Sequence, residues 1–184
     1  MRTRTLTALM LAVTVVGCRP TDPDRYSFLP SVGSRVPAFR YTSLDGVPLD
    51  ASSVVGHPSV IALWSSTCSA SRHALRALSV LAESVAARGG RVVVLADDAD
   101  RTRVDRLVRE TGASLTIALA AGTLMDTFTH SQSRLPWRKV LALPTFLVLD
   151  AEGRIVHRQI GVELEPRQQL RGVRAAVDSL LAPR

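Results

Sequence analysis

The sequence lacks the features that indicate a membrane-spanning, metal-binding or nucleic-acid-binding protein. No apolar run reaches the length of about 18 residues that a transmembrane helix needs. The chain has only two cysteines and no CxxC or HxxxH spacing, so neither a metal ion nor another cofactor is expected. Lys139 is the only lysine among 23 basic residues, and the arginines are scattered among acids. We therefore do not expect a nucleic-acid partner, despite the formal net charge of +7.

The N-terminus has the pattern of an export signal. Arg2 and Arg4 precede an apolar stretch from Leu6 to Gly17, which is too short to cross a bilayer and suits the apolar core of a signal peptide. We expect export to the bacterial cell envelope. A buried N-terminal strand is the alternative.

The apolar stretch ends in Val15-Val16-Gly17-Cys18, which resembles a bacterial lipobox, in which the cysteine is lipidated and becomes the new N-terminus. This resemblance implies that residues 1–17 form a lipoprotein signal peptide and that a lipid on Cys18 anchors the protein to the membrane at its periplasmic face. Residues 18–31 are rich in proline and aspartate and are expected to form a tether. A plain secretory signal with an incidental cysteine remains open.

From residue 32 to residue 184 the pattern is that of strands alternating with helices. Continuous or alternating apolar runs predict strands at 39–43, 47–49, 60–64, 92–96, 145–149 and 154–160. One-sided apolar spacing predicts helices over 69–88, from Asp100 to Gly112, and from Pro166 onward. Asp45-Gly46 predicts a hairpin between the first two strands. The expected class is α/β, with a central mixed sheet flanked by helices and an N-terminal β-hairpin extension.

The segment from Trp64 to Arg72, where a strand meets a helix, contains the residues suited to chemistry. Cys68 is expected at the start of that helix, where unpaired backbone N–H groups and the helix dipole favour a thiolate. A cysteine in this position is a candidate nucleophile.

These residues resemble the thioredoxin superfamily, and within it the TlpA-like, membrane-anchored thiol–disulfide oxidoreductases of the redoxin family. Members carry a W-x-x-x-C-x-x-C-R segment. Trp64, Cys68 and Arg72 match three of its fixed positions, and Ser71 replaces the second cysteine. The similarity continues upstream in Pro37-Ala38-Phe39 and downstream in the hairpin motif at 150–156.

Leu143-Pro144 falls where the family has its cis-proline. The resemblance implies a thioredoxin-like fold, with Pro144 packed beside the thiol and the Leu143 backbone open to an extended substrate strand. The expected substrate groove consists of Trp64, Thr67, Arg72, Leu143 and Pro144.

Ser71 removes the step by which a second thiol resolves a mixed disulfide, although its hydroxyl can still donate a hydrogen bond to the Cys68 thiolate. Three functions remain open. In the first, Cys68 and Ser71 form the catalytic pair of a monothiol disulfide-exchange enzyme that acts on envelope proteins or small thiols. In the second, the domain is a redox-inactive binding module. In the third, Cys68 reduces peroxides through a sulfenic acid.

Other polar residues are given structural roles. His73 is expected to be a partly exposed helix histidine. Asp97, Asp98 and Asp100 are expected to form a polar turn with Asp100 as the helix cap, rather than a calcium site. Trp137, Arg138 and Lys139 are candidates for the rim of the groove.

Overall fold

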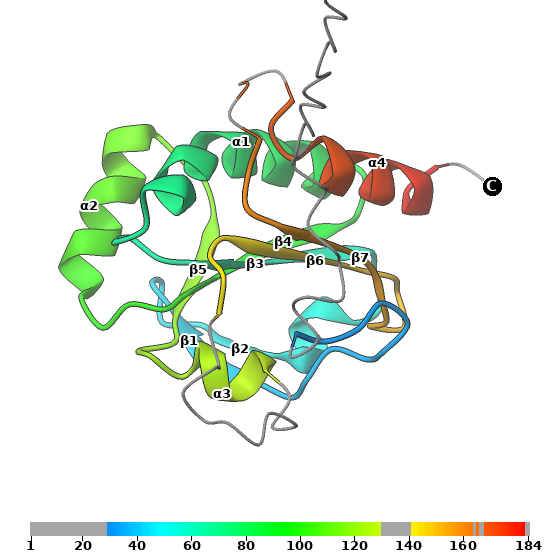
Figure 1. The fold of residues 1–184 in the computed structure, drawn as a ribbon, viewed down its shortest axis with the longest axis horizontal. Helices are drawn as coiled ribbons and strands as arrows, with labels where there is room; N and C mark the ends of the chain where they lie inside the picture. Colours follow the sequence, from blue (N-terminus) through cyan, green and yellow to red (C-terminus); the bar gives the residue numbers. More distant parts are fainter. Residues whose placement is uncertain (1–28, 130–140, 164, 166–167, 183–184) are drawn as a thin grey trace, which may run out of the picture.

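A mixed sheet of seven strands forms the centre of the molecule in the computed structural model, which describes residues 29–129, 141–163, 165 and 168–182 (Figure 1). The strand order is β2-β1-β5-β4-β3-β6-β7, and only the β3–β4 and β4–β5 pairs are parallel. The strands are β1 (Arg40–Ser43), β2 (Pro48–Asp50), β3 (Ser59–Trp64), β4 (Arg91–Ala96), β5 (Thr116–Leu119), β6 (Thr145–Leu149) and β7 (Ile155–Ile160). The expected α/β class with a mixed sheet is confirmed.

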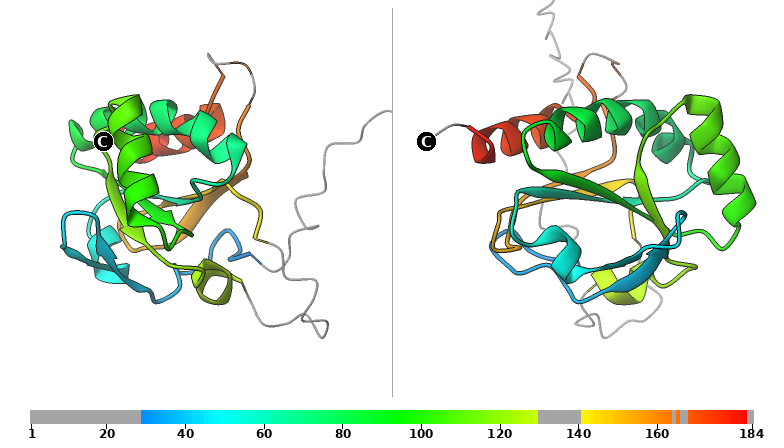
Figure 2. Two further views of the ribbon diagram at one scale, coloured as in Figure 1. Left: turned by 90° about the vertical axis from the view of Figure 1, so that its left-hand side faces the viewer. Right: turned by 180° about the vertical axis from the view of Figure 1, so that it is seen from behind.

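Helices cover both faces of this sheet. They are α1 (Ser69–Ala86), α2 (Arg101–Thr111), α3 (Leu124–Phe128), α4 (Arg171–Leu180) and the short 3-10 helix η2 (Ala51–Val54). Helices α1 and α4 lie side by side over one face, and α3 lies on the other (Figures 1 and 2). None of the helices in the described part of the chain is long and apolar enough to cross a membrane.

The central strands are buried on both sides, which explains their continuous apolar runs. All six residues of β3 are buried. Because side chains alternate along a strand, Val60, Ala62 and Trp64 face the core beneath α1 and α4, whereas Ile61 and Leu63 face the core beside α3. The molecule therefore has two apolar cores separated by the sheet.

Several local predictions are confirmed. β1 and β2 pair as an antiparallel hairpin across the turn at Gly46. The Asp100 side chain accepts a hydrogen bond from the Arg103 N–H and caps α2, which ends at Gly112 in the left-handed conformation that glycine adopts readily.

Two element predictions need correction or lie outside the described residues. Strand β5 was not predicted, because it has only four residues and just two of them, Ile117 and Ala118, are fully buried. It forms because β4 and β1 flank it and supply hydrogen-bonding partners on both edges. Helix α4 begins at Arg171, after a turn over residues 168–170, and the proposed start at Pro166 lies outside the described residues.

Residues 1–28, and with them the expected signal peptide and Cys18, also lie outside the described part of the chain. Leu29 and Pro30, near the end of the expected tether, belong to the described residues and are buried. The Arg158 guanidinium on β7 donates to both of their carbonyl oxygens, at 3.4 and 3.3 Å. The structure therefore attaches the end of this segment to the domain.

Candidate functional site

Cys68 is the N-cap residue of α1, at the end of the turn that follows β3. Its N–H donates to the Ser65 carbonyl oxygen at 3.3 Å, and its own carbonyl accepts the first helical hydrogen bond, from the Arg72 N–H at 3.0 Å. The thiol is half-buried, and Cys68 is the free cysteine of the described residues. This is the position that the sequence predicted for a nucleophile.

The peptide bond between Leu143 and Pro144 is cis, as the resemblance implied. The two residues precede β6, which is the antiparallel neighbour of β3. The Cys68 Sγ lies 3.4 Å from the Leu143 carbonyl oxygen and donates to it when protonated. Two segments 75 residues apart in sequence therefore meet at the thiol. Leu143 is half-buried and Pro144 is buried.

Ser71 occupies the place of a second cysteine and is fully buried. Its Oγ accepts a hydrogen bond from the Ser65 N–H at 3.3 Å, and its carbonyl oxygen accepts one from the Trp64 indole N–H at 2.6 Å. These bonds connect the first turn of α1 to the end of β3. Trp64 is also fully buried, so it supports the site from beneath rather than lining a substrate groove as the sequence suggested.

The environment favours the thiolate of Cys68. Partial burial raises the pKa of the thiol, but hydrogen bonds from the Ser71 N–H, the Ser71 hydroxyl and the Ala70 N–H oppose this effect, and so does the positive charge of Arg72. The net result is a pKa of Cys68 below its ordinary value of 9.0. A lower pKa increases the thiolate fraction near neutral pH, and the thiolate is the form that attacks disulfides.

Asp98, which the sequence analysis placed only in a polar turn, is a buried part of this site. Its Oδ2 accepts from the Ser66 N–H at 2.8 Å, and its Oδ1 accepts from the Ser66 hydroxyl. Asp98 follows β4, and β3 and β4 are parallel neighbours, so their carboxyl ends meet at one edge of the sheet. That adjacency is the information that would have linked Asp98 to the Ser66 turn.

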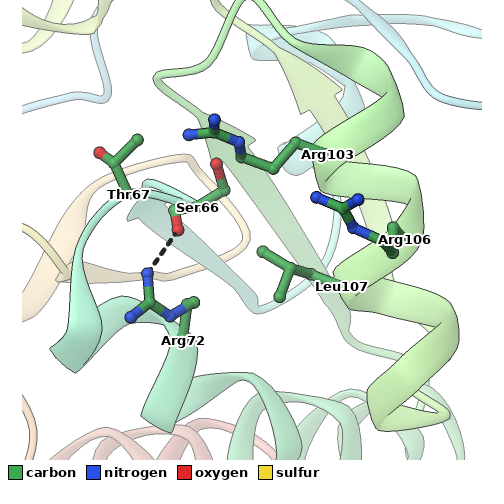
Figure 3. A pocket seen from close by; sticks show the side chains of 6 residues that line it. All are labelled: Ser66, Thr67, Arg72, Arg103, Arg106 and Leu107. Carbon is green, nitrogen blue, oxygen red and sulfur yellow. Dashed lines mark hydrogen bonds between the residues drawn. The ribbon is translucent and has the colours of Figure 1, made fainter.

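The outer side of the turn opens onto a cleft of about 420 Å³. It is lined by Ser66, Thr67, Arg72, Arg103, Arg106 and Leu107, and Figure 3 shows the arginine side chains around it. Thr67 and Arg72 are exposed. The Arg72 Nη1 donates to the Ser66 carbonyl oxygen at 3.0 Å, which holds its guanidinium against the turn.

The remaining residues named from the sequence do not join the site in the described part of the chain. His73 is exposed on α1. Trp137, Arg138 and Lys139 lie outside the described residues. Among the residues that the structure describes, no group of three or more histidine, cysteine, aspartate or glutamate side chains is arranged to hold a metal ion.

Comparison with known proteins bears on the family and the fold of the chain. The model of the Redoxin family matches residues 31–176, which is most of the chain. No curated protein sequence matches the chain.

Solved structures share this fold at low sequence identity, between 16% and 22% for the three described here. A putative protein disulfide isomerase from Bacteroides thetaiotaomicron superposes with a TM-score of 0.69 at 16% identity, covering 85% of this chain and 93% of that one. A putative thiol:disulfide interchange protein DsbE from Chlorobium tepidum gives a TM-score of 0.61 at 19% identity, covering 80% and 97%. A secreted Mycobacterium tuberculosis disulfide oxidoreductase gives 0.57 at 22% identity, covering 77% and 96%. The likeness shows a thioredoxin-like fold.

Proposed function

This chain belongs to the Redoxin family, and on that premise we propose that it is a thiol–disulfide oxidoreductase of the bacterial envelope that acts through the single nucleophile Cys68. The observation that carries the proposal is the position of Cys68. It caps α1 beside cis-Pro144, with a lowered pKa and with Ser71 where a resolving cysteine would stand.

The reaction begins with attack of the Cys68 thiolate on a substrate disulfide. A bond forms between the Cys68 Sγ and one substrate sulfur, the substrate disulfide breaks, and the second sulfur leaves as a thiolate that takes a proton from water. Because the Ser71 hydroxyl is not appreciably ionised near neutral pH, it does not attack the mixed disulfide. A thiolate from a second molecule must do so, and this attack restores the Cys68 thiolate.

The substrate groove consists of Thr67, Arg72 and the Leu143–Pro144 segment. The Leu143 N–H has no hydrogen-bonding partner in the described part of the chain, and Leu143 is half-buried. An extended substrate strand can donate to and accept from this backbone in the manner of an added β-strand. Envelope proteins and small molecules that carry a disulfide or a thiol are the expected partners.

The proposed location is the periplasmic face of a membrane, with residues 1–17 as a lipoprotein signal peptide and a lipid on Cys18 as the anchor. The lipobox-like sequence that ends at Cys18 supports this part of the proposal. One structural relative is described as secreted, which agrees with export.

The test is the fate of the mixed disulfide. The purified protein would be incubated with 2-hydroxyethyl disulfide and followed by intact mass spectrometry. We expect the native protein to accumulate a Cys68 adduct, the Cys68→Ser variant to form none, and the Ser71→Cys variant to release the adduct as an internal disulfide forms. Absence of an adduct on the native protein, together with alkylation showing that Cys68 is accessible, would overturn the proposal.

A redox-inactive binding module is the second candidate. Ser71 accepts two hydrogen bonds, from the Ser65 N–H and from the Trp64 indole N–H. This second function is favoured because these bonds give Ser71 a structural role that requires no catalytic activity. The same experiment separates the two functions, because a binding module forms no adduct.

A further inference from the structure

The cleft beside the Ser66–Thr67 turn, here called the arginine cleft, lies between the start of α1 and one face of α2. Arg72 comes from α1, whereas Arg103, Arg106 and Leu107 come from α2, three and four residues apart and so on one helix face. The volume of about 420 Å³ is in the range of small-molecule sites.

Positive charge predominates in this cleft. The Arg106 guanidinium makes no hydrogen bond or ion pair with any residue that the structure describes. Among the described residues Arg103 forms one ion pair, with Asp100, at 3.8 Å between Nε and Oδ2. Both oxygens of Asp98 accept hydrogen bonds from Ser66, and Asp98 is not among the described residues that line the cleft. Guanidinium groups arranged in this way suit carboxylates, which they bind through paired N–H donors.

The cleft lies next to the residue that carries the thiol, although Cys68 does not line it and its Sγ lies against the Leu143 carbonyl oxygen. Thr67 lines the cleft and Cys68 is the next residue, and consecutive Cα atoms are about 3.8 Å apart. A molecule with a carboxylate among the arginines must extend across Thr67 to place a sulfur at the Cys68 Sγ.

We propose that the arginine cleft selects small anionic disulfides, of the kind formed by carboxylate-bearing low-molecular-weight thiols, as substrates of Cys68. This inference rests on the proposed disulfide exchange. The Cys68 thiolate attacks one sulfur of the disulfide, the carboxylates of the bound half are held by Arg72, Arg103 and Arg106, and the other half leaves as a thiolate. A second small thiol then attacks the mixed disulfide and leaves Cys68 as a thiolate.

A small molecule suits the cleft better than a protein does. Protein interfaces have an apolar centre, and among the described residues Leu107 is the single large apolar residue that lines this cleft. The exposed large apolar side chains of the described residues all lie elsewhere: Val32, Val47, Val55, Val80 and Val156.

The test compares disulfides of different charge. The full chain would be mixed at low ionic strength with glutathione disulfide, which is anionic, with neutral 2-hydroxyethyl disulfide and with cationic cystamine, and adduct formation would be timed by mass spectrometry. We expect the rate relative to the neutral disulfide to be highest for glutathione disulfide and lowest for cystamine, and added salt to reduce the difference.

Arg103→Gln and Arg106→Gln are each expected to lower the ratio of the glutathione disulfide rate to the neutral rate about threefold or more. Arg109→Gln is the matched control, because it removes the same charge from α2 at an exposed position that does not line the cleft. It is expected to change the ratio less than either cleft variant does.

The outcomes distinguish this inference from the proposed function. If no disulfide forms an adduct, disulfide exchange is wrong. If adducts form but the ratio is the same in the native protein and in both cleft variants, the cleft assignment is wrong. A rate advantage confined to an acidic peptide disulfide, and absent for glutathione disulfide, would also overturn it.

Binding provides a readout that does not require the thiol. Calorimetric titration of the Cys68→Ser protein with S-methylglutathione is expected to show binding that Arg106→Gln weakens. Equal affinity with and without Arg106 would overturn the cleft assignment.

Discussion

Ser71 affects the thiol of Cys68 in two ways that mutation can separate. Its N–H and its hydroxyl both contribute to the lowered pKa of Cys68, and the N–H belongs to the helix backbone. Ser71 is also fully buried, and its Oγ accepts a hydrogen bond from the Ser65 N–H. A change of the side chain alone therefore removes one part of the thiolate stabilisation and leaves the other.

Ser71→Ala is expected to raise the pKa of Cys68 without restoring it fully to the value of an isolated thiol, because the backbone donors remain. The measurement is the pH dependence of alkylation by iodoacetamide, whose midpoint reports the pKa. In the native protein the rate should rise with pH through a midpoint below 9.0, and in the variant the midpoint should lie at higher pH.

Ser69→Ala is the control, since Ser69 is exposed at the first position of α1 and is not among the groups that shift the pKa of Cys68. Equal midpoints for the native protein and Ser71→Ala would show that the hydroxyl does not stabilise the thiolate.

Asp98 supports the turn that carries Cys68. Asp98→Asn keeps one carbonyl-type oxygen but loses the charge and the second acceptor, so one of the two Ser66 donors is left without a partner. We expect a loss of about 1–3 kcal/mol in the free energy of unfolding, measured by urea denaturation.

Asp97→Asn is the matched control for this change. The Asp97 Oδ1 is buried and has no hydrogen-bonding partner among the described residues, so loss of its charge should cost less stability than the same change at Asp98. An equal loss at the two positions would contradict the support role of Asp98.

At the scale of elements, β7 and α4 meet at a histidine. His157 on β7 is half-buried, its Nε2 has no partner within the described residues, and burial lowers its pKa. Gly172 on α4 lies against it: a Cβ at residue 172 would be 3.1 Å from the His157 Nε2 and 3.1 Å from the Gln159 Oε1. A larger residue there would press on these two side chains, which would have to shift by a few tenths of an ångström.

The lowered pKa of His157 makes stability depend on pH. Because the folded pKa lies below the ordinary value of 6.5, the unfolded state binds more protons in the range just below 6.5. The free energy of unfolding should therefore fall as the pH decreases through 6.5 toward the folded pKa, and it should be highest above 6.5. Urea denaturation over this range measures the effect.

His157→Gln should flatten this pH dependence, whereas His73→Gln, at an exposed site on α1, should leave it in place. An unchanged slope in His157→Gln would show that other groups cause the loss of stability.

Element prediction succeeded where periodicity was strong. The run at 60–64 corresponds to most of β3, and the apolar spacing of 69–88 covers all of α1, which ends at Ala86. Burial on two faces or on one stripe leaves a direct pattern in the sequence. Strand β5 was missed because four residues are too few to show a period. Its conformation depends on the partner strands on each side of it.

At the scale of the whole molecule, the sheet separates two cores that should respond to mutation independently. Ile117 on β5 packs in the core beneath α1 and α4, and Ile61 on β3 packs in the opposite core. Both side chains are almost completely buried.

Ile117→Val and Ile61→Val are each expected to lower the free energy of unfolding by about 0.5–1.5 kcal/mol, because each removes one buried methyl group. The double variant should show the sum to within about 0.5 kcal/mol. Chemical denaturation of the four proteins measures this. A larger departure from additivity would show that the sheet transmits strain between the cores.

The sequence by itself determined the α/β class and the place of Cys68 at a helix start. Local chemistry suffices for these two features, since buried strands must be apolar and helix N-termini favour anions. The cis-proline segment beside Cys68 was expected only because the sequence resembles a known family.

Only the tertiary structure decided which distant side chains meet there. The pairing of β3 with β4 brings Asp98 to Ser66, the packing of α2 against α1 brings Arg103 and Arg106 to Arg72, and burial removes Trp64 from the surface. These contacts depend on the relative placement of whole elements, which no local pattern of residues specifies.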